Sequence, residues 1–255
     1  FLGGKIENDE LKRAEYYANY YHLNLHYVDI DWNTVVDNID VVIEHKGAPV
    51  HSIEPQLYEA AKQAKADGVT MLVIGDAADY VFGGMDGLLS KNWGFQEYID
   101  RSCYIDPKLV LKEPYPMDYL FERYRIGKNS INYIKFYNEI VTDESYASYE
   151  NALSAAGLDF IDPYELLVMS HPLDLGKVRN GDSKYIIRDL FRMKYPDITV
   201  PIKQPMPRPV DEYFANWEGP KRPEFRDDID MSQLTGNQKW LLFCLEYFLN
   251  KYDKK

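Results

Sequence analysis

One stretch, residues 68–84 (GVTMLVIGDAADYVFGG), most limits what the chain can fold into. An apolar run of strand length, residues 69–74, stops at Gly75, and two carboxylates follow at Asp76 and Asp79. This pattern predicts a buried strand that enters a helix. In an open α/β sheet, ligands bind at the carboxyl ends of the strands, where the next helix presents free backbone N–H groups. An aspartate pair at such a turn could hold a metal ion and handle protons.

A purely structural interpretation fits the same spacing. Asp76 could be an N-cap residue, and Asp79 could be a first-turn acid that the helix dipole favours. Such a pairing occurs in many ordinary helices. The spacing alone leaves both interpretations open.

Length and composition are typical of a globular protein. The 255 residues are 45% hydrophobic, enough to bury a sizeable core as one large domain or one and a half. No run approaches the roughly 18 apolar residues of a membrane span, and we expect no signal peptide. The two cysteines, Cys103 and Cys244, lie far apart without a CxxC spacing, which is typical of a reducing compartment. We therefore expect a cytoplasmic protein with no membrane partner.

The charge of the chain bears on its partners. The formal net charge is -12. Binding to a nucleic-acid backbone needs a basic surface that displaces counterions, so we expect no nucleic-acid partner. A small-molecule substrate fits the composition better.

The order of the expected elements predicts the fold class. We expect a helix from Glu7 or Asn8 to about Tyr21, a strand from Leu25 to Val28, and helices from Asn33 to Glu44 and from Pro55 to Ala66. Alternating strands and helices form α/β folds with a mostly parallel sheet flanked by helices. From Leu88 to about Glu144 the pattern changes to aromatic-rich stretches broken by prolines, which indicates a helical region. Residues 236–255 predict an amphipathic helix that packs over this region.

The segment 68–84 resembles a stretch that reads roughly SGEGxDExFGG in the synthetase domain of asparagine synthetases. Gly75, Asp76 and Asp79 fall on the first glycine, the first acid and the aspartate of that motif, and residues 82–84 fall on FGG. Four positions differ: Ile74 replaces a serine, Asp76 a glutamate, Ala77 a glycine and Tyr80 the second acid.

Two later segments resemble the same family, in the family's order. Residues 151–169 resemble its gVexRxPfld stretch, with Ile161 and Asp162 in place of the expected arginine and apolar residue. Residues 181–207 resemble a G-x-x-K-x-x-x-R pattern, in which Lys184 opens a helix with an inward apolar face. Each segment also has an alternative without a chemical role. The first could be a helix–turn–helix junction, and Lys184 in the second could be a solvated helix lysine.

The resemblance implies an ATP-dependent amide-forming ligase with an adenine nucleotide alpha hydrolase-like fold. Such enzymes use ATP and Mg²⁺ to adenylate a carboxylate, and an amine or ammonia then displaces AMP. On the matching positions, Asp79 is the candidate Mg²⁺ ligand, Asp76 the candidate catalytic proton acceptor, and Lys184 the candidate catalytic and nucleotide-binding contact to pyrophosphate. The backbone at Gly3, Ile74 and Gly75 falls where the family holds adenosine.

One motif of the family does not occur in this sequence, the pyrophosphate-binding loop SGGxDS. We expect that this segment precedes Phe1 in the native protein, since loss of a central strand would expose an apolar edge. A degenerate relative that cannot hold triphosphate is the alternative. We divide the chain into residues 1–90, a nucleotide-binding α/β core that lacks its first strand and loop, and residues 91–255, the mainly helical part of the same synthetase domain.

The expected partners follow from the same resemblance. They are a small-molecule carboxylate, a nitrogen donor, a glutaminase domain or subunit that this sequence does not contain, and a second copy of the chain in a homodimer. The alternative function is a non-catalytic, synthetase-like protein that binds a nucleotide or a partner protein.

Overall fold

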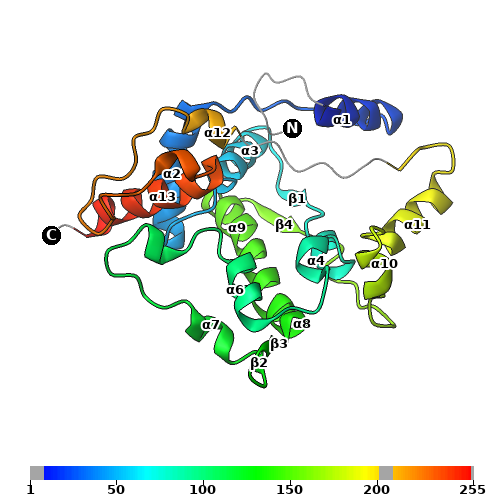
Figure 1. Cartoon of the computed structure of the whole chain (residues 1–255). Helices are drawn as coiled ribbons and strands as arrows, with labels where there is room; N and C mark the ends of the chain where they lie inside the picture. Colours follow the sequence, from blue (N-terminus) through cyan, green and yellow to red (C-terminus); the bar gives the residue numbers. More distant parts are fainter. Residues whose placement is uncertain (1–8, 201–208, 254–255) are drawn as a thin grey trace.

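The computed structural model describes residues 9–200 and 209–253, and it is mainly helical (Figure 1). The helices of the first part are α1 (Asp9–Tyr20), α2 (Trp32–Lys46), α3 (Glu54–Ala66), α4 (Ala77–Val81), α5 (Asp86–Leu89) and α6 (Phe95–Ser102). Those of the second part are α7 (Asp118–Glu122), α8 (Tyr133–Phe136), α9 (Thr142–Ala155), α10 (Leu175–Arg179), α11 (Tyr185–Lys194), α12 (Val210–Tyr213) and α13 (Gly236–Tyr252). Short helical turns of other types are η1 (Pro107–Leu109), η2 (Tyr137–Val141) and η3 (Met231–Gln233).

The described residues contain two small sheets. Strand β1 (Met71–Val73) pairs in parallel with β4 (Asp159–Ile161), and β2 (Arg125–Ile126) pairs in antiparallel with β3 (Ser130–Ile131). The expected mostly parallel sheet is therefore represented in this part of the chain by a single parallel pair. Residues 25–28, expected to form a strand, contain only a bridge residue at Val28.

Strand β1 lies where the sequence predicts it, but the prediction that it is buried is wrong. Met71 is 53% exposed and Val73 is 70% exposed. Both side chains point to the same face, because successive residues of a strand alternate between faces. Burial of a strand depends on layers that cover its faces, and no described element covers this one.

The longer helices begin and end at residues that match the sequence signals. Asp31 caps α2, since its Oδ1 accepts a hydrogen bond from Thr34 N at 2.8 Å. Gly47 ends the same helix with φ +67° and donates its N–H to Ile43 O. Thr235 and Gln238 form a capping box at the start of α13. The predicted helices at 33–44 and 55–66 are thus confirmed to within two residues at each end.

The C-terminal helix packs mainly on the N-terminal part of the chain. Trp240 of α13 lies in one buried cluster with Val35, Ile39 and Ile43 of α2, and its Nε1 donates to Val50 O at 2.8 Å. Leu242 packs with Val110, which belongs to the stretch from Leu88 to Glu144 expected to be a helical region. The prediction that α13 packs over that region is therefore correct for one of its faces and misses the other.

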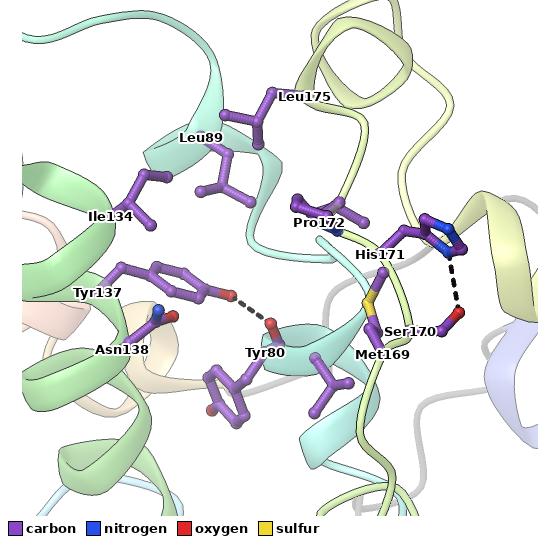
Figure 2. A pocket seen from close by; sticks show the side chains of 12 residues that line it. Tyr80, Leu89, Ile134, Tyr137, Asn138, Met169, Ser170, His171, Pro172 and Leu175 are labelled. Carbon is purple, nitrogen blue, oxygen red and sulfur yellow. Dashed lines mark hydrogen bonds between the residues drawn. The ribbon is translucent and has the colours of Figure 1, made fainter.

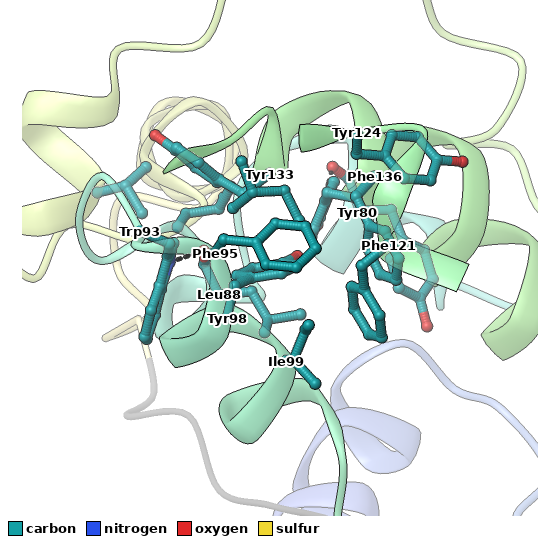
Figure 3. Packing of buried hydrophobic residues seen from close by; sticks show 14 of the residues in the cluster. Tyr80, Leu88, Trp93, Phe95, Tyr98, Ile99, Phe121, Tyr124, Tyr133 and Phe136 are labelled. Carbon is teal, nitrogen blue, oxygen red and sulfur yellow. Dashed lines mark hydrogen bonds between the residues drawn. The ribbon is translucent and has the colours of Figure 1, made fainter. Parts of the chain in front are cut away.

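A second buried cluster, made mostly of aromatic side chains, joins α4, α5, α6, α7, α8 and α10 (Figure 3). Tyr98 lies near its centre and is fully buried, and the rings of Phe121 and Phe136 stack with centroids 4.6 Å apart. Ala77 and Tyr80 of α4 belong to this cluster. The aromatic-rich region predicted to be helical therefore forms the packed base on which α4 rests, and Ile131 of the hairpin β2–β3 packs into the same cluster.

A buried carboxylate ties α2, α3 and α9 together. Glu54, at the start of α3, is fully buried, and its Oε1 accepts from Lys46 Nζ at 2.8 Å and from His51 N at 2.7 Å. Its Oε2 accepts from Asn151 Nδ2 at 2.6 Å. These partners satisfy a charge that would otherwise be costly to bury.

Helix α11 departs from its expected packing. Its pattern predicts an inward apolar face, yet none of its residues is buried and Leu190 is 45% exposed.

The described helices were also compared with the length and hydropathy that a membrane span requires. In residues 9–200 and 209–253, no helix meets both requirements.

Candidate functional site

The acidic turn lies where β1 ends and α4 begins, as the sequence predicts. Asp76 occupies the N-cap position of α4, but it has helical backbone angles and makes no capping hydrogen bond. Asp162 supplies that contact, because its Oδ2 accepts from Ala77 N at 2.6 Å. The simple interpretation of Asp76 as a capping side chain therefore does not describe this helix.

Asp162 is a residue of the site that the sequence reasoning did not identify. It follows β4 directly, and β4 runs parallel to β1, so the two strands end at the same edge. Its carboxylate is buried, and Oδ1 also accepts from Tyr164 N at 2.9 Å. An acid placed directly after the apolar end of a strand was the available signal, the same one that singled out Asp76.

Asp76 lies in an environment that favours its protonated form. Burial is the largest cause and raises the pKa of its carboxyl group above the ordinary value. Hydrogen bonds from the hydroxyl groups of Tyr80 and Tyr149 oppose this change, and the charges of Asp79 and Asp162 add to it. Within the described residues, Asp76 Oδ2 is buried and has no hydrogen-bond partner.

This environment predicts a pH-dependent effect of Asp76→Asn on stability. Because the folded-state pKa is raised above the ordinary value of 3.8, the folded chain binds more protons than the unfolded chain above that pH. Ionised Asp76 is therefore destabilising at neutral pH, and Asp76→Asn is expected to raise the midpoint of thermal unfolding at pH 7.

The gain should shrink as the pH falls toward 4, where the wild-type carboxyl group becomes protonated in both states. Thermal unfolding followed by circular dichroism between pH 4 and 8 measures the difference. Asp159→Asn, a change of the same kind at an exposed position of β4, is the control. A destabilised Asp76→Asn chain at pH 7 would contradict the assigned environment.

The structure brings two predicted site residues together. Lys184 Nζ lies 2.7 Å from Asp79 Oδ2, although 105 positions separate the two residues in the sequence. Asp79 is on α4, and Lys184 is the N-cap residue of α11. About a fifth of each side chain is exposed, so the pair is partly accessible to solvent.

The backbone holds Lys184 in an unusual conformation. Its φ of +55° lies in the left-handed region, which a residue with a β-carbon rarely adopts. Its N–H donates to Phe82 O at 3.1 Å, just beyond α4. Strained backbone of this kind concentrates at functional sites, where the surrounding structure compensates for its cost.

Two consecutive glycines make the ion pair sterically feasible. A Cβ atom on Gly84 would lie 2.1 Å from Asp79 Oδ1 and 2.4 Å from Lys184 Cε. A Cβ atom on Gly83 would lie 2.7 Å from Leu173 Cδ2, and Gly83 also has φ +74°. The two glycines that follow Phe82 thus let Leu173 approach at Gly83 and Lys184 approach at Gly84, close to the end of α4.

Two cavities adjoin α4, and Tyr80 and Val81 line both. The larger has a volume of about 520 Å³ and lies between α4, the α8–η2 segment and residues 169–175 (Figure 2). The smaller, about 360 Å³, is lined on its other side by residues of α9, among them Asp143 and Glu150, and by Glu165. The lining of neither cavity includes Asp76, Asp79 or Lys184.

The family is decided by a comparison of the sequence with family models. The model described as asparagine synthase matches residues 3–150. The chain belongs to the asparagine synthase family. No curated protein and no solved structure matches it.

The residues matched by the asparagine synthase family model include only part of the candidate site. The match includes Asp76 and Asp79 but ends before Asp162 and Lys184. The position of Lys184 beside Asp79 therefore rests on the geometry and not on the family match. The family is ATP-dependent, and an α/β fold is expected for its synthetase domain.

The predicted metal role of Asp79 can be compared with the site. Among the described residues, no group of three or more His, Cys, Asp or Glu side chains could hold a metal ion. Asp79 Oδ2 is paired with Lys184, and Oδ1 lies against Gly84. The side chains around Asp79 do not form a Mg²⁺ site as they are arranged here. The role of Asp79 as a metal ligand stays a prediction.

The predicted adenosine contacts are placed only in part. Ile74 and Gly75 follow β1 at the edge where the acidic turn lies, and the N–H of Ile74 donates to Ile161 O at 3.0 Å. That N–H is therefore already used, and the Gly75 carbonyl accepts from Ala78 N at 3.4 Å, although Gly75 itself is exposed. Gly3 lies outside the described residues.

Proposed function

We propose that this member of the asparagine synthase family is an ATP-dependent carbon–nitrogen ligase that adenylates a carboxylate and converts it to an amide. The observation that carries the proposal is the contact between Lys184 and Asp79 at the carboxyl end of β1. It provides a partly exposed ammonium group beside an acidic turn at the edge where α/β proteins bind nucleotides.

The first step would be adenylation. A carboxylate oxygen of the substrate attacks the α-phosphorus of ATP, and the bond from that phosphorus to the pyrophosphate oxygen breaks. Negative charge grows on the departing pyrophosphate. Lys184 would stabilise this charge by exchanging the Asp79 carboxylate for phosphate oxygens, which suits a flexible side chain with a point charge.

The second step would be amide formation. The nitrogen of ammonia or an amine attacks the acyl carbon, the bond from that carbon to the AMP oxygen breaks, and AMP leaves. The attacking nitrogen loses a proton, which the Asp76 carboxylate would accept. A pKa raised by burial makes this carboxylate a stronger base than an exposed aspartate.

The assignment joins the two predicted parts of the chain. We place nucleotide binding in residues 1–90 and the helical part of the same domain in residues 91–255, with Lys184 contributed by the second. The nitrogen source is proposed to be ammonia or a separate glutaminase domain or subunit. The cytoplasm is the proposed location.

The proposal predicts a strong effect of Lys184→Met on catalysis. With ATP, Mg²⁺ and a panel of carboxylates, the wild-type chain is expected to release AMP and pyrophosphate. Lys184→Met should lower kcat by about 100-fold, the loss typical of removing one group that stabilises charge in the transition state. Lys177→Met is the control. Lys177 belongs to the neighbouring helix α10, and its ammonium group lies over the Tyr185 ring, so its removal should leave the rate nearly unchanged.

A second function has one observation in its favour. Asp79 Oδ2 is already paired with Lys184 inside the protein, which also suits a relative that binds a nucleotide or a partner protein without catalysis. The same experiment separates the two. If no carboxylate gives AMP, and Asp79→Ala leaves the affinity for ATP unchanged, the ligase proposal fails.

A further inference from the structure

The larger cavity beside α4 has an apolar floor and a polar mouth. Tyr80, Leu89 and Tyr137 form buried walls, whereas Asn138 and residues 170–172 are exposed. Figure 2 shows Tyr137 and Asn138 on one side and residues 169–172 on the other, with Tyr80 between them. Its volume of about 520 Å³ lies within the range of about 300 to 1,000 Å³ that holds small organic ligands.

The charge of the lining limits what the cavity can hold. None of the described residues that line it is Asp, Glu, Lys or Arg, and His171 at the mouth is its one side chain able to carry a positive charge. An amino dicarboxylic acid such as aspartate carries two carboxylates and an ammonium group. Most of these charges would lack a partner here, and an unpaired buried charge is strongly unfavourable.

An apolar group gains free energy in the same place. Burying apolar surface is favourable by about 25 cal/mol for each Å² removed from water. The lining includes Val81, Leu89, Ile134, Leu173 and Leu175. An aromatic ring or branched alkyl group therefore matches the walls, and a single polar head matches the mouth.

The cavity adjoins the ion pair through the two glycines. Leu173 lines the cavity and lies against Gly83, while Asp79 and Lys184 lie against Gly84. The Tyr137 hydroxyl, also in the lining, donates to Asp79 O at 3.0 Å. A ligand body in the cavity would thus lie next to the elements that position Asp79 and Lys184.

We infer that the acceptor substrate of this ligase is a monocarboxylic acid with an aromatic or branched aliphatic body, which binds in this cavity. The inference rests on the proposed function, and it narrows the substrate class. Aspartate, with its second carboxylate and its ammonium group, is the acid that the cavity disfavours.

Binding without ATP tests the inference independently of catalysis. Isothermal titration calorimetry would compare 3-phenylpropionate, 4-methylpentanoate and L-aspartate. The two apolar acids are expected to bind at least about tenfold more tightly than aspartate, a difference of about 1.4 kcal/mol. Asn138→Trp, at the exposed mouth, should occupy the cavity and weaken their binding about tenfold or more.

Val168→Trp is the matched control. It adds the same side chain to the nearby loop, at a position that is exposed and outside the lining, and should leave binding unchanged. Tighter binding of aspartate, or unchanged affinity in Asn138→Trp, would overturn the inference.

Pyrophosphate release separates the two proposals. Release with aspartate and not with the apolar acids would overturn the inference and leave the ligase proposal standing. Binding of the apolar acids in the cavity, with no pyrophosphate from any acid, would overturn the ligase proposal and with it the role of acceptor, while the cavity would remain a site for apolar acids. Release with apolar acids, lowered in Asn138→Trp, supports both.

Discussion

Replacing Gly84 with alanine is expected to lower the free energy of unfolding by about 2 to 3 kcal/mol and to remove the proposed activity. The new Cβ atom would lie 2.8 Å from Asp79 Cα, besides the closer contacts to Asp79 Oδ1 and Lys184 Cε. Lysine could swing away, but a backbone atom cannot do so without moving α4. Both the helix position and the ion pair would therefore change.

Urea unfolding followed by circular dichroism measures the loss of stability. Gly75→Ala, in the same segment, is the matched control, because Gly75 has no positive φ and a Cβ atom added there would meet nothing closer than a Tyr164 ring carbon at 3.5 Å. The free energy of unfolding of Gly75→Ala should differ from that of the wild-type chain by less than about 1 kcal/mol, since the added methyl group makes only ordinary contacts. Equal losses in both variants would show that the approach at Gly84 is not special.

Glu54→Ala is expected to be the most destabilising single substitution considered, at about 3 to 5 kcal/mol. It would remove one of the two acceptors of the buried Asn151 amide, which also donates to Val42 O at 3.0 Å, and would leave Lys46 without its counterion. It would also open a cavity where α2, α3 and α9 meet. Lys46 is partly exposed and can regain some hydration, which places the loss toward the lower end of this range.

The matched control is an ion pair at the surface, between α2 and α13. Glu44 pairs with Lys251 at 3.4 Å and is mostly exposed. Glu44→Ala should change the free energy of unfolding by less than about 1 kcal/mol, because water and salt screen such pairs. Chemical unfolding of both variants compares the two. A small effect of Glu54→Ala would mean that solvent enters this junction more easily than its burial indicates.

Local signals in the sequence predicted the helices well. Apolar spacing predicted the helix at 33–44, and Pro55, suited to a first helical turn, predicted the start of the helix at 55–66. These signals act between residues that are close in the sequence, so they do not depend on how distant segments pack. The resemblance to asparagine synthetases, read from segment 68–84, is confirmed by the family match.

The predictions that failed concern contacts between distant segments. Residues 25–28 alternate like a strand, yet a strand needs a partner that the local pattern does not specify. Strand β1 is apolar but exposed at Met71 and Val73, since burial depends on covering layers. Helix α11 has an apolar stripe and no buried residue for the same reason.

Three residues of the candidate site were named from the sequence, but the contacts between them could not be. Asp76, Asp79 and Lys184 were singled out from sequence, and the structure places Lys184 against Asp79. The capping role of Asp162 and the buried junction at Glu54 were not predicted, because a buried acid is recognised only by partners that lie far away in the sequence. The catalytic roles of these residues remain proposals.

The distance along the chain between Asp79 and Lys184 has a consequence for biosynthesis. The capping contact from Asp162 to α4 spans 85 positions, and the ion pair spans 105. A growing chain cannot complete the acidic turn until Lys184 has left the ribosome, long after α4 itself has emerged. Closing so long a loop is entropically costly, so nascent chains that stop short of this lysine should lack the finished site even if their N-terminal helices have formed.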